Sequence, residues 1–391
     1  HSIEASTDRE LFKTVEFELG ETDSILGTPL TIPLSQDATA VRISYSTTPG
    51  ATALQWLDAE QTFGKKAPFL FTQSQEIHAR SWIPLQDTPG VRVTYSAIIE
   101  TPNDLLAVMS DCRRASTSRR GSYQFEMTYP IPPYLIALAV GDIAFASTGP
   151  RTGVYAELSL LEAAKDEFAE ADRMLQAAER LYGNYLWDRF DILVLPPSFP
   201  FGGMENPGVT FVTPTLITGD RSSVSVIAHE LAHAWSGNLV TNATWSDFWL
   251  NEGFTTYTER RIQEELYGSS RAAMEEVLAE ERLAKEMKCL PPEDQLLHPD
   301  LKGRDPEATL VPYVKGALFL KSLENTFGRA RFDAYLRSYF EHFAFKSITT
   351  AEAIDYLRTT LLDKYPELAA KIPLEEWLCA PGLPDSAPKA V

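Results

Sequence analysis

Residues 229–233 read His-Glu-Leu-Ala-His, and the residues just before them, Val224-Ser-Val-Ile-Ala228, are mostly apolar. An apolar run of this kind favours a buried helix. Helix positions four residues apart lie on one face, so the imidazoles of His229 and His233 can reach one metal ion. Glu230 lies between them and can face a water molecule beside that ion. The pattern is typical of a catalytic zinc site.

A third candidate ligand follows downstream. Metzincin proteases carry a glycine and a histidine further along this pattern, but Ser236 and Leu239 stand at those positions, which excludes that class. Glu252, within Trp249-Leu-Asn-Glu-Gly-Phe254, follows His233 at a distance that allows a loop and a second helix. Two imidazoles and one carboxylate leave the fourth position of a tetrahedral site open, as in catalytic zinc sites. We therefore expect one Zn²⁺ per chain.

Other titratable residues have weaker patterns. Glu259 follows Glu252 by two turns on the same helix face and could orient a ligand histidine by a hydrogen bond. A solvated helix glutamate is an equal alternative for Glu259. The remaining histidines have no ligand-like neighbour at short spacing, and we interpret them as surface or hydrogen-bonded residues: His1, His78, His298 and His342.

Composition excludes several classes of partner. The chain has 391 residues, a hydrophobic fraction of 44% and a charged fraction of 23%, which fit a folded protein of two domains. Its formal net charge of −19 argues against nucleic-acid binding. No apolar run is long enough for membrane insertion. The cysteines (Cys112, Cys289 and Cys379) are too few and dispersed for a disulfide framework, so we expect a cytoplasmic protein. The oligomeric state stays open.

The chain divides into a strand-rich and a helix-rich part. Residues 1–147 are expected to form a β-rich domain, with strands near 41–45, 91–95 and 134–140. Residues 148–384 are expected to form a mostly helical catalytic domain, and 385–391 a tail or linker. The fold class is therefore α+β. Within the second part we expect a strand at 191–195 and helices at 158–181, 223–236, 246–266, 270–287, 313–327, 329–343 and 350–364.

A further motif, Phe201-Gly-Gly-Met-Glu-Asn206, stands upstream. With the two motifs above, it resembles the GxMEN pattern of the aminopeptidase N-like gluzincin zinc aminopeptidases. The longer runs 202–215, 226–240 and 248–253 are similar to the leukotriene hydrolase branch. That resemblance implies a β-rich N-terminal domain, a thermolysin-like catalytic domain and a helical C-terminal domain. Relative to that plan we expect the N-terminal domain to be shortened and the C-terminal helical domain to be lacking.

The resemblance also implies roles for individual residues. Glu230 would act as general base and acid, and Tyr313 would donate a hydrogen bond to the negative charge that develops on the scissile carbonyl oxygen. Glu205 would bind the free α-ammonium group of a peptide, with Gln75 as a second contact. The backbone of Gly202, Gly203 and Met204 would lie along the extended peptide. The expected function is hydrolysis of the N-terminal residue of peptides that have a free N-terminus.

Two alternatives stay open. The first is a lipid epoxide hydrolase, since leukotriene hydrolases also open a fatty epoxide. In the family that activity depends on an aspartate, whose place Glu307 takes here, and on basic residues of the helical domain. We therefore expect peptide hydrolysis rather than epoxide hydrolysis. The second is a catalytically weak binding or scaffold protein that keeps zinc for folding, although the sequence offers no fourth protein ligand to close the metal site.

Overall fold

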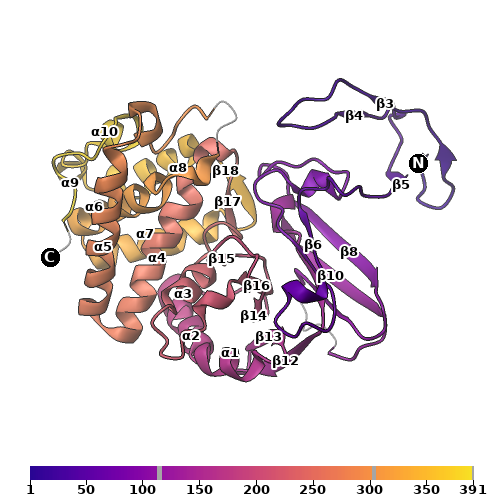
Figure 1. The fold of residues 1–391 in the computed structure, drawn as a ribbon. Helices are drawn as coiled ribbons and strands as arrows, with labels where there is room; N and C mark the ends of the chain where they lie inside the picture. The colour runs from indigo at the N-terminus through magenta and orange to yellow at the C-terminus, as the bar shows by residue number, and fades with distance from the viewer. Residues whose placement is uncertain (112–116, 302–304, 390–391) are drawn as a thin grey trace.

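The N-terminal part of the protein consists of small antiparallel sheets. The computed structural model describes residues 1–111, 117–301 and 305–389, and Figure 1 shows its fold. In the described part the strand orders are β2-β1-β5, β3-β4, β10-β8 and β6-β7-β11-β9. The strands are β1 (Ser2–Ser6), β2 (Lys13–Thr14), β3 (Glu18–Leu19), β4 (Leu30–Thr31), β5 (Ala40–Ser44), β6 (Leu54–Leu57), β7 (Phe69–Thr72), β8 (Val93–Glu100), β9 (Leu106–Met109), β10 (Ser122–Ile131) and β11 (Leu138–Gly141).

The strands predicted in this part are present with shifted ends. The alternating segment at 41–45 lies in β5, and the segment at 91–95 overlaps the start of β8. The strand predicted over 134–140 is correct only from Leu138 onward, where β11 begins. Residues Pro133–Leu135 form a short 3₁₀ turn instead, with Pro132 before it. A proline has no backbone N–H to donate to a sheet, so this pair of prolines favours a turn.

A five-stranded sheet connects the β-rich part to the helices. Its order is β12-β13-β14-β16-β15, with the three central strands parallel and both edge strands antiparallel. The strands are β12 (Ile143–Ser147), β13 (Thr152–Glu157), β14 (Phe190–Val194), β15 (Gly203–Met204) and β16 (Val209–Val212). Because β12 pairs with β13, we propose that the domain division lies just before Ile143 rather than between 147 and 148.

The rest of the protein is mostly helical. Its helices are α1 (Leu161–Glu167), α2 (Ala171–Tyr182), α3 (Ser225–Ala232), α4 (Trp249–Tyr267), α5 (Ser269–Met287), α6 (Gly316–Phe327), α7 (Arg329–His342), α8 (Thr350–Leu357), α9 (Pro366–Ala369) and α10 (Leu374–Cys379). A short parallel pair, β17 (Val240–Asn242) and β18 (Lys346–Ile348), accompanies them. Helix α4 packs against α3, α5 and α6, and most of its residues are buried. The predicted fold class is confirmed.

Several predicted helices differ from the structure. The helix predicted over 350–364 ends as an α-helix at Leu357 and continues as a π-helical turn over Arg358–Leu362, and the one predicted over 223–236 spans only Ser225–Ala232. The segment 158–181 is interrupted, so that α1 ends at Glu167 and α2 starts at Ala171. The helix expected from 313 begins at Gly316, because Val311–Lys315 form a π-helical turn. Wide turns of this type are frequent at functional sites, and this one contains Tyr313.

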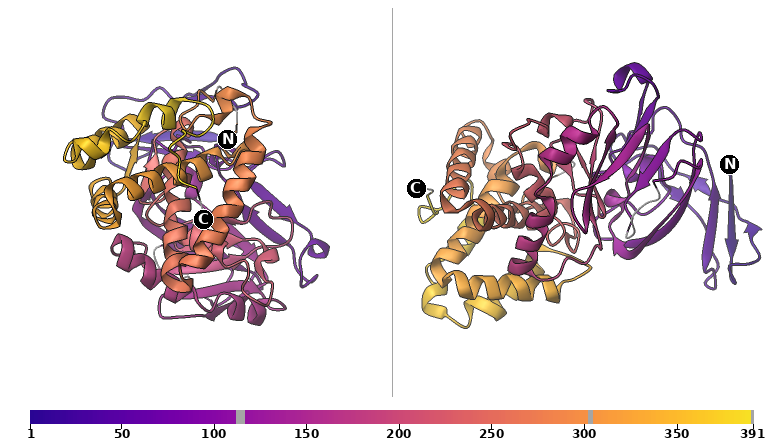
Figure 2. Two further views of the ribbon diagram at one scale, coloured as in Figure 1. Left: turned by 90° about the vertical axis from the view of Figure 1, so that its left-hand side faces the viewer. Right: turned by 90° about the horizontal axis from the view of Figure 1, so that it is seen from below.

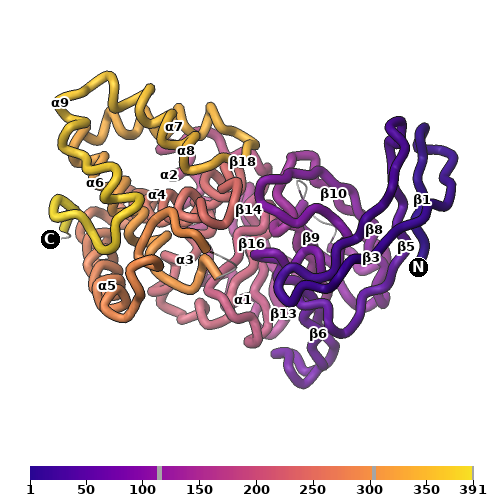
Figure 3. The backbone as a smooth tube through the Cα atoms, turned by 90° about the horizontal axis from the view of Figure 1, so that it is seen from above, coloured from indigo at the N-terminus to yellow at the C-terminus, as the bar shows by residue number. Residues whose placement is uncertain are grey.

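The arrangement of the parts is elongated. Figure 2 shows the β-rich part at one end of the molecule and the C-terminal helices at the other. The backbone trace in Figure 3 places β13, β14 and β16 of the five-stranded sheet between them. In the described part of the chain no helix is both long and apolar enough to cross a membrane. Cys289 and Cys379 are free and exposed, and Cys112 lies outside the described residues.

Candidate active site

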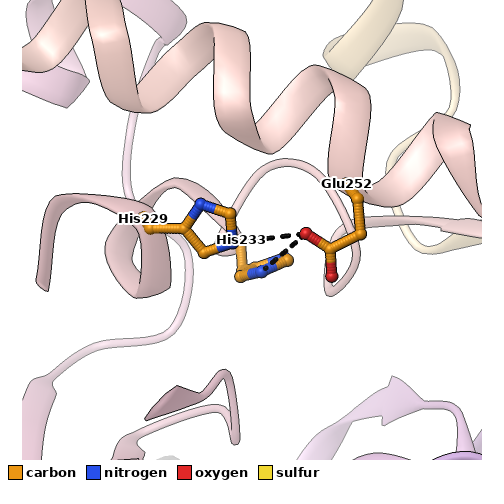
Figure 4. A group of neighbouring side chains, drawn as sticks. All are labelled: His229, His233 and Glu252. Carbon is orange, nitrogen blue, oxygen red and sulfur yellow. Dashed lines mark ion pairs between the residues drawn. The ribbon is translucent and has the colours of Figure 1, made fainter. Parts of the chain in front are cut away.

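The three predicted metal ligands come together from two helices. His229 lies in the last turn of α3, His233 caps the end of that helix, and Glu252 lies in the first turn of α4. The Nε2 atoms of His229 and His233 lie 3.2 and 3.7 Å from Oε2 of Glu252, as the dashed lines in Figure 4 show. One ligand atom from each of the three residues falls within 4.8 Å of the others. The three side chains therefore converge on one point.

The other nitrogen of each imidazole has its own partner. Nδ1 of His229 lies 3.0 Å from Oε2 of Glu259, which corresponds to one of the two interpretations given for that glutamate. Nδ1 of His233 lies 3.0 Å from the Ser236 carbonyl oxygen and 3.1 Å from Oγ1 of Thr255. A hydrogen bond at Nδ1 fixes the ring so that Nε2 faces the ion, as in other histidine metal sites.

These atoms fit a zinc ion. Oε2 of Glu252 is buried and has no hydrogen-bond partner, although two imidazole nitrogens face it. A buried carboxylate oxygen in that state costs free energy unless a cation or a donor satisfies it. Two imidazole nitrogens and one carboxylate oxygen are the donors that catalytic zinc sites use. The residues present can hold Zn²⁺ without rearrangement of their side chains.

Three supporting residues were not predicted from the sequence. Nε2 of Gln263 donates to Oε1 of Glu259 at 2.8 Å, and so holds the carboxylate that contacts His229. Gln263 lies four residues after Glu259 in α4, a spacing that could have indicated this contact. Ser236 and Thr255 meet at His233 from different elements, so no local pattern indicated them.

A cleft of about 300 Å³ surrounds this point. All the predicted site residues line it, together with four residues that the sequence had not indicated, Gln73, Phe201, Ser225 and Val226. The backbone of Gly203 lies against Glu230. A Cβ atom at Gly203 would lie 2.2 Å from Oε1 of Glu230, whereas one at Gly202 would meet only Val226, at 3.6 Å. Of these two positions, only position 203 must be a glycine for the Glu230 carboxylate to keep its place.

Glu205 follows β15 and is buried in the wall of the cleft. Its backbone carbonyl accepts a hydrogen bond from Nδ2 of Asn238 at 2.8 Å, while its Oε1 has no partner. Burial, with the nearby charges of Glu252 and Glu230, raises the pKa of Glu205 well above its ordinary value. A carboxylate in this state has a strong preference for a cationic ligand.

Burial also shifts the pKa values of Glu230, His233 and His229. Burial raises the pKa of Glu230 to about 8. Burial lowers the pKa of His233 to about 4, so its imidazole is neutral at pH 7, which is the form that binds a metal. For His229, burial opposes the charged form, but the neighbouring carboxylates of Glu252 and Glu259 outweigh burial and raise its pKa. The raised pKa values show that buried carboxyl groups are crowded together here, and a bound cation would favour their ionised forms.

Tyr313 and Gln75 face the cleft from separate elements. The ring of Tyr313 stacks on that of His229 with centroids 6.4 Å apart, and burial raises its pKa well above 10, so it keeps its proton. Gln75 comes from the loop after β7, in the β-rich part, and its amide donates to Oε1 of Glu307. Burial raises the pKa of Glu307 to about 7.

Comparison with known proteins identifies the family of this chain. Residues 167–371 match the Peptidase family M1 domain, and residues 3–135 match the Peptidase M1 N-terminal domain. Leucine aminopeptidase 2 of Yarrowia lipolytica is 46% identical over 390 residues, which are 95% of this chain and 59% of that protein. Leukotriene A-4 hydrolase of Xenopus laevis is 45% identical over 392 residues, 96% of this chain and 64% of that protein. The chain thus spans about 60% of the length of these relatives.

A solved structure supports the same family assignment. The structure of yeast LTA4 hydrolase in complex with bestatin superposes with a TM-score of 0.93 and 38% identity, covering 100% of this chain and 62% of that one. The resemblance to the leukotriene hydrolase branch is confirmed by these relatives, and so is the shorter length of this chain relative to them. With more than half of its residues in the matched domains, the chain belongs to peptidase family M1.

Proposed function

We propose that this protein is a zinc aminopeptidase that removes the N-terminal residue of peptides. The observation that carries the proposal is the convergence of His229, His233 and Glu252 on one point, with Glu230 and Glu205 in the same cleft. The relatives support it, since one is named a leucine aminopeptidase and another, 45% identical and from Mus musculus, aminopeptidase B. We also propose one zinc ion per chain, with His229, His233 and Glu252 as its ligands.

The bound zinc ion would supply Lewis acidity, which polarises a carbonyl group and lowers the pKa of water. Glu230 accepts the proton of the attacking water and delivers it to the nitrogen of the leaving amine. Gly203 holds the Glu230 carboxylate close to the backbone of β15. The Tyr313 hydroxyl, which keeps its proton, donates a hydrogen bond to the carbonyl oxygen as negative charge develops there.

Glu205 limits cleavage to the chain end. Its buried carboxylate binds the α-ammonium group of the substrate, because only a cation compensates its charge in this wall of the cleft. Gln75 provides a second polar contact for that group. The short strand β15 has an edge position in its sheet, so the backbone of Gly202, Gly203 and Met204 is available to pair with an extended peptide.

The test is the Glu230→Gln variant assayed with chromogenic aminoacyl substrates. The wild-type protein should release the first residue, and it should not cleave the same substrates when their amine is acetylated. Glu230→Gln should retain its metal and lose at least about 100-fold in kcat, as expected for loss of a general base. Metal content is measured on the same samples. An active, metal-loaded Glu230→Gln protein would contradict the proposed role of Glu230.

A second candidate is lipid epoxide hydrolysis, because one relative is named leukotriene A-4 hydrolase. An apolar cavity of about 220 Å³, lined among others by Trp245, Phe248 and Leu297, has room for part of an acyl chain. Glu307, which takes the place of the family's aspartate, is engaged by Gln75. We expect no diol product from an epoxide fatty acid. Detection of such a product, lost with metal removal, would establish this second activity.

A third candidate is a binding or scaffold protein that keeps zinc only for folding. In that case chelation would unfold the protein, and no substrate in a panel of aminoacyl compounds would be turned over. For an aminopeptidase we expect chelation to abolish activity and readdition of zinc to restore it. We further propose a cytoplasmic location, since the few dispersed cysteines suit a reducing compartment; cell fractionation tests it.

A further inference from the structure

Lys315 is a buried lysine at the end of the turn that carries Tyr313. It is the last residue of the π-helical turn Val311–Lys315, and its side chain is fully buried. Its Nζ atom donates to the carbonyl oxygens of Gln295 and Ala380, each at 2.8 Å. Among the residues that the structure describes, no carboxylate forms an ion pair with this amine. Its hydrogen bonds therefore go to two backbone groups of other segments.

A lysine at this position costs free energy that an apolar residue would not. An ammonium group removed from water loses its hydration, and two neutral carbonyl oxygens replace only part of that loss. Burial accordingly lowers the pKa of Lys315 to about 8. A methionine of similar length would fill the same space without this cost. What the lysine adds to packing is its two hydrogen bonds.

The two acceptor carbonyls belong to segments that are joined to each other. Nε2 of Gln295 donates to the carbonyl oxygen of Met287, the last residue of α5, at 3.1 Å. Oε1 of Gln295 accepts from the backbone N–H of Gly382, two residues after Ala380, at 3.0 Å. Lys315 thus ties the π-helical turn to a point that the end of α5 and the segment after α10 share.

Another side of the same turn lies against the metal-binding helix. A Cβ atom on Gly316, the residue after the turn, would lie 2.8 Å from Cα of Gly253, which follows the ligand Glu252 in α4. Helix residues two apart do not face each other, so the side chains of Tyr313 and Lys315 leave the turn in different directions. The turn is therefore held between α4 and the anchor of Lys315.

The Tyr313 hydroxyl has no hydrogen bond within the described part of the chain. Its ring contacts those of His229 and Phe248, with centroids 6.4 and 6.0 Å apart. Apolar contacts of this kind are not directional, so they do not by themselves fix how far the ring extends into the cleft. The position of the hydroxyl therefore depends on the backbone of the turn.

We propose that Lys315 is a positioning residue for Tyr313, because it ties the π-helical turn to Gln295 and Ala380 and so fixes where the Tyr313 hydroxyl lies in the cleft. The inference rests on the proposed role of Tyr313 and extends it to the end of α5 and the segment after α10. A purely structural lysine would affect stability alone. A positioning lysine affects the rate, and only while the Tyr313 hydroxyl is present.

The test is a double-mutant cycle between Lys315→Met and Tyr313→Phe, assayed with chromogenic aminoacyl substrates. Lys315→Met keeps the length of the side chain and removes its donors. Since a misplacement near 1 Å costs about 100-fold, we expect kcat to fall roughly 10- to 100-fold. KM should change by less than about twofold, because Tyr313 acts on charge that develops only in the transition state. In the Tyr313→Phe background, Lys315→Met should cause no further loss.

Arg337→Met is the matched control. Arg337 also donates to two backbone carbonyls of another segment, those of Arg180 and Leu181, but it does not line the cleft. Its kcat should match that of wild type. Zinc content and the midpoint of denaturant unfolding are measured on every variant. Should Lys315→Met yield no folded protein, Gln295→Met enters the same cycle, because it releases an acceptor carbonyl from α5 and leaves Lys315 in place.

The possible outcomes are distinct. Equal losses of kcat in both backgrounds, or an impaired Tyr313→Phe beside a fully active Lys315→Met, overturn the proposal for Lys315 and leave the role of Tyr313 intact. A fully active Tyr313→Phe protein overturns both. A wild-type protein that cleaves no aminoacyl substrate contradicts the proposed peptidase function itself.

Discussion

Gly203 shows how a single residue controls the geometry of the site. There is no room for a side chain, because a Cβ atom would lie 2.2 Å from Oε1 and 2.4 Å from Cδ of Glu230. Gly203→Ala must therefore displace the Glu230 carboxylate, and a misplacement near 1 Å costs about 100-fold in rate. We expect kcat/KM to fall by about that factor while metal content is retained. Gly202→Ala has space for its methyl group and should lose far less; similar losses in both variants would contradict this account.

A second prediction at the residue scale concerns Glu259, which we expect to increase the affinity for the metal. It contacts Nδ1 of His229 at 3.0 Å and is itself held by Gln263. In Glu259→Gln a neutral amide replaces the carboxylate, so the imidazole becomes a poorer ligand. We expect zinc affinity to fall roughly 10- to 100-fold, measured by competition with a chelator. Glu265→Gln, on the same helix but paired with Arg180 at the surface, is the control and should bind zinc normally.

At the scale of elements, the contact between α4 and α6 depends on two glycines. A Cβ atom on Gly253 would lie 2.8 Å from Cα of Gly316, so the two backbones touch. Gly253→Ala must push the helices apart, and overpacking of this kind typically costs about 1–3 kcal/mol. We expect a lower midpoint of denaturant unfolding with an unchanged slope. Gly50→Ala, at an exposed turn with free space, should be nearly neutral.

Glu324 connects helices α4, α6 and α7. We expect it to make the stability of the fold depend on pH. It accepts hydrogen bonds from Arg329 at 2.6 Å, Lys321 at 3.0 Å and the Tyr257 hydroxyl at 3.1 Å. Burial alone would raise its pKa, but Arg329 and Lys321 outweigh burial and lower it. The carboxylate therefore stabilises the fold at pH values above its ordinary pKa, and this contribution is lost as the pH falls through the lowered value.

The measurement is the free energy of unfolding of wild type and Glu324→Gln as a function of pH. At pH 7 the variant should be less stable by about 1–3 kcal/mol, from loss of charged hydrogen bonds. The difference should start to shrink near pH 4.5, where the carboxylate of the unfolded chain takes up a proton, and should be lost as the pH falls through the lowered pKa of the folded protein. Glu162→Gln, at an exposed position, should match wild type throughout. A difference that stayed constant down to pH 2 would show that charge is not the cause.

At the scale of the whole molecule, Arg92 holds the β-rich part against the catalytic part. Its guanidinium donates to Asn238 and Thr241 on one side and to the Pro130 carbonyl, at 2.9 Å, on the other. Arg92→Met leaves these acceptors without donors, which should cost about 1–3 kcal/mol. We expect calorimetry to show a lower and broader transition, as the two parts unfold less cooperatively. Arg42→Met, whose partner Glu4 lies in the same small sheet, should keep the wild-type transition.

Local pattern, together with the family resemblance, indicated the candidate metal ligands and the fold class. His229, Glu230 and His233 fall within one helical turn, and Glu252 follows near the start of the next helix, so their spacing reflects helix geometry. The alternation at 91–95 likewise identified a strand. Local signals failed where the chain changes direction without a change in hydrophobicity. The interruption between α1 and α2 and the π-helical turn at Val311–Lys315 are examples.

The rest of the site depends on contacts between distant segments. The resemblance implied roles for Gln75 and Glu205, but no pattern in the sequence placed these two residues in one cleft, because periodicity reports which face of an element is buried and not what covers it. The tertiary structure brings Gln75 from the β-rich part and Glu205 from the catalytic part to one cleft. Burial there also sets the charge states of Glu205, Glu230 and His233. Desolvation is a property of the assembled fold, and the order of residues does not contain it.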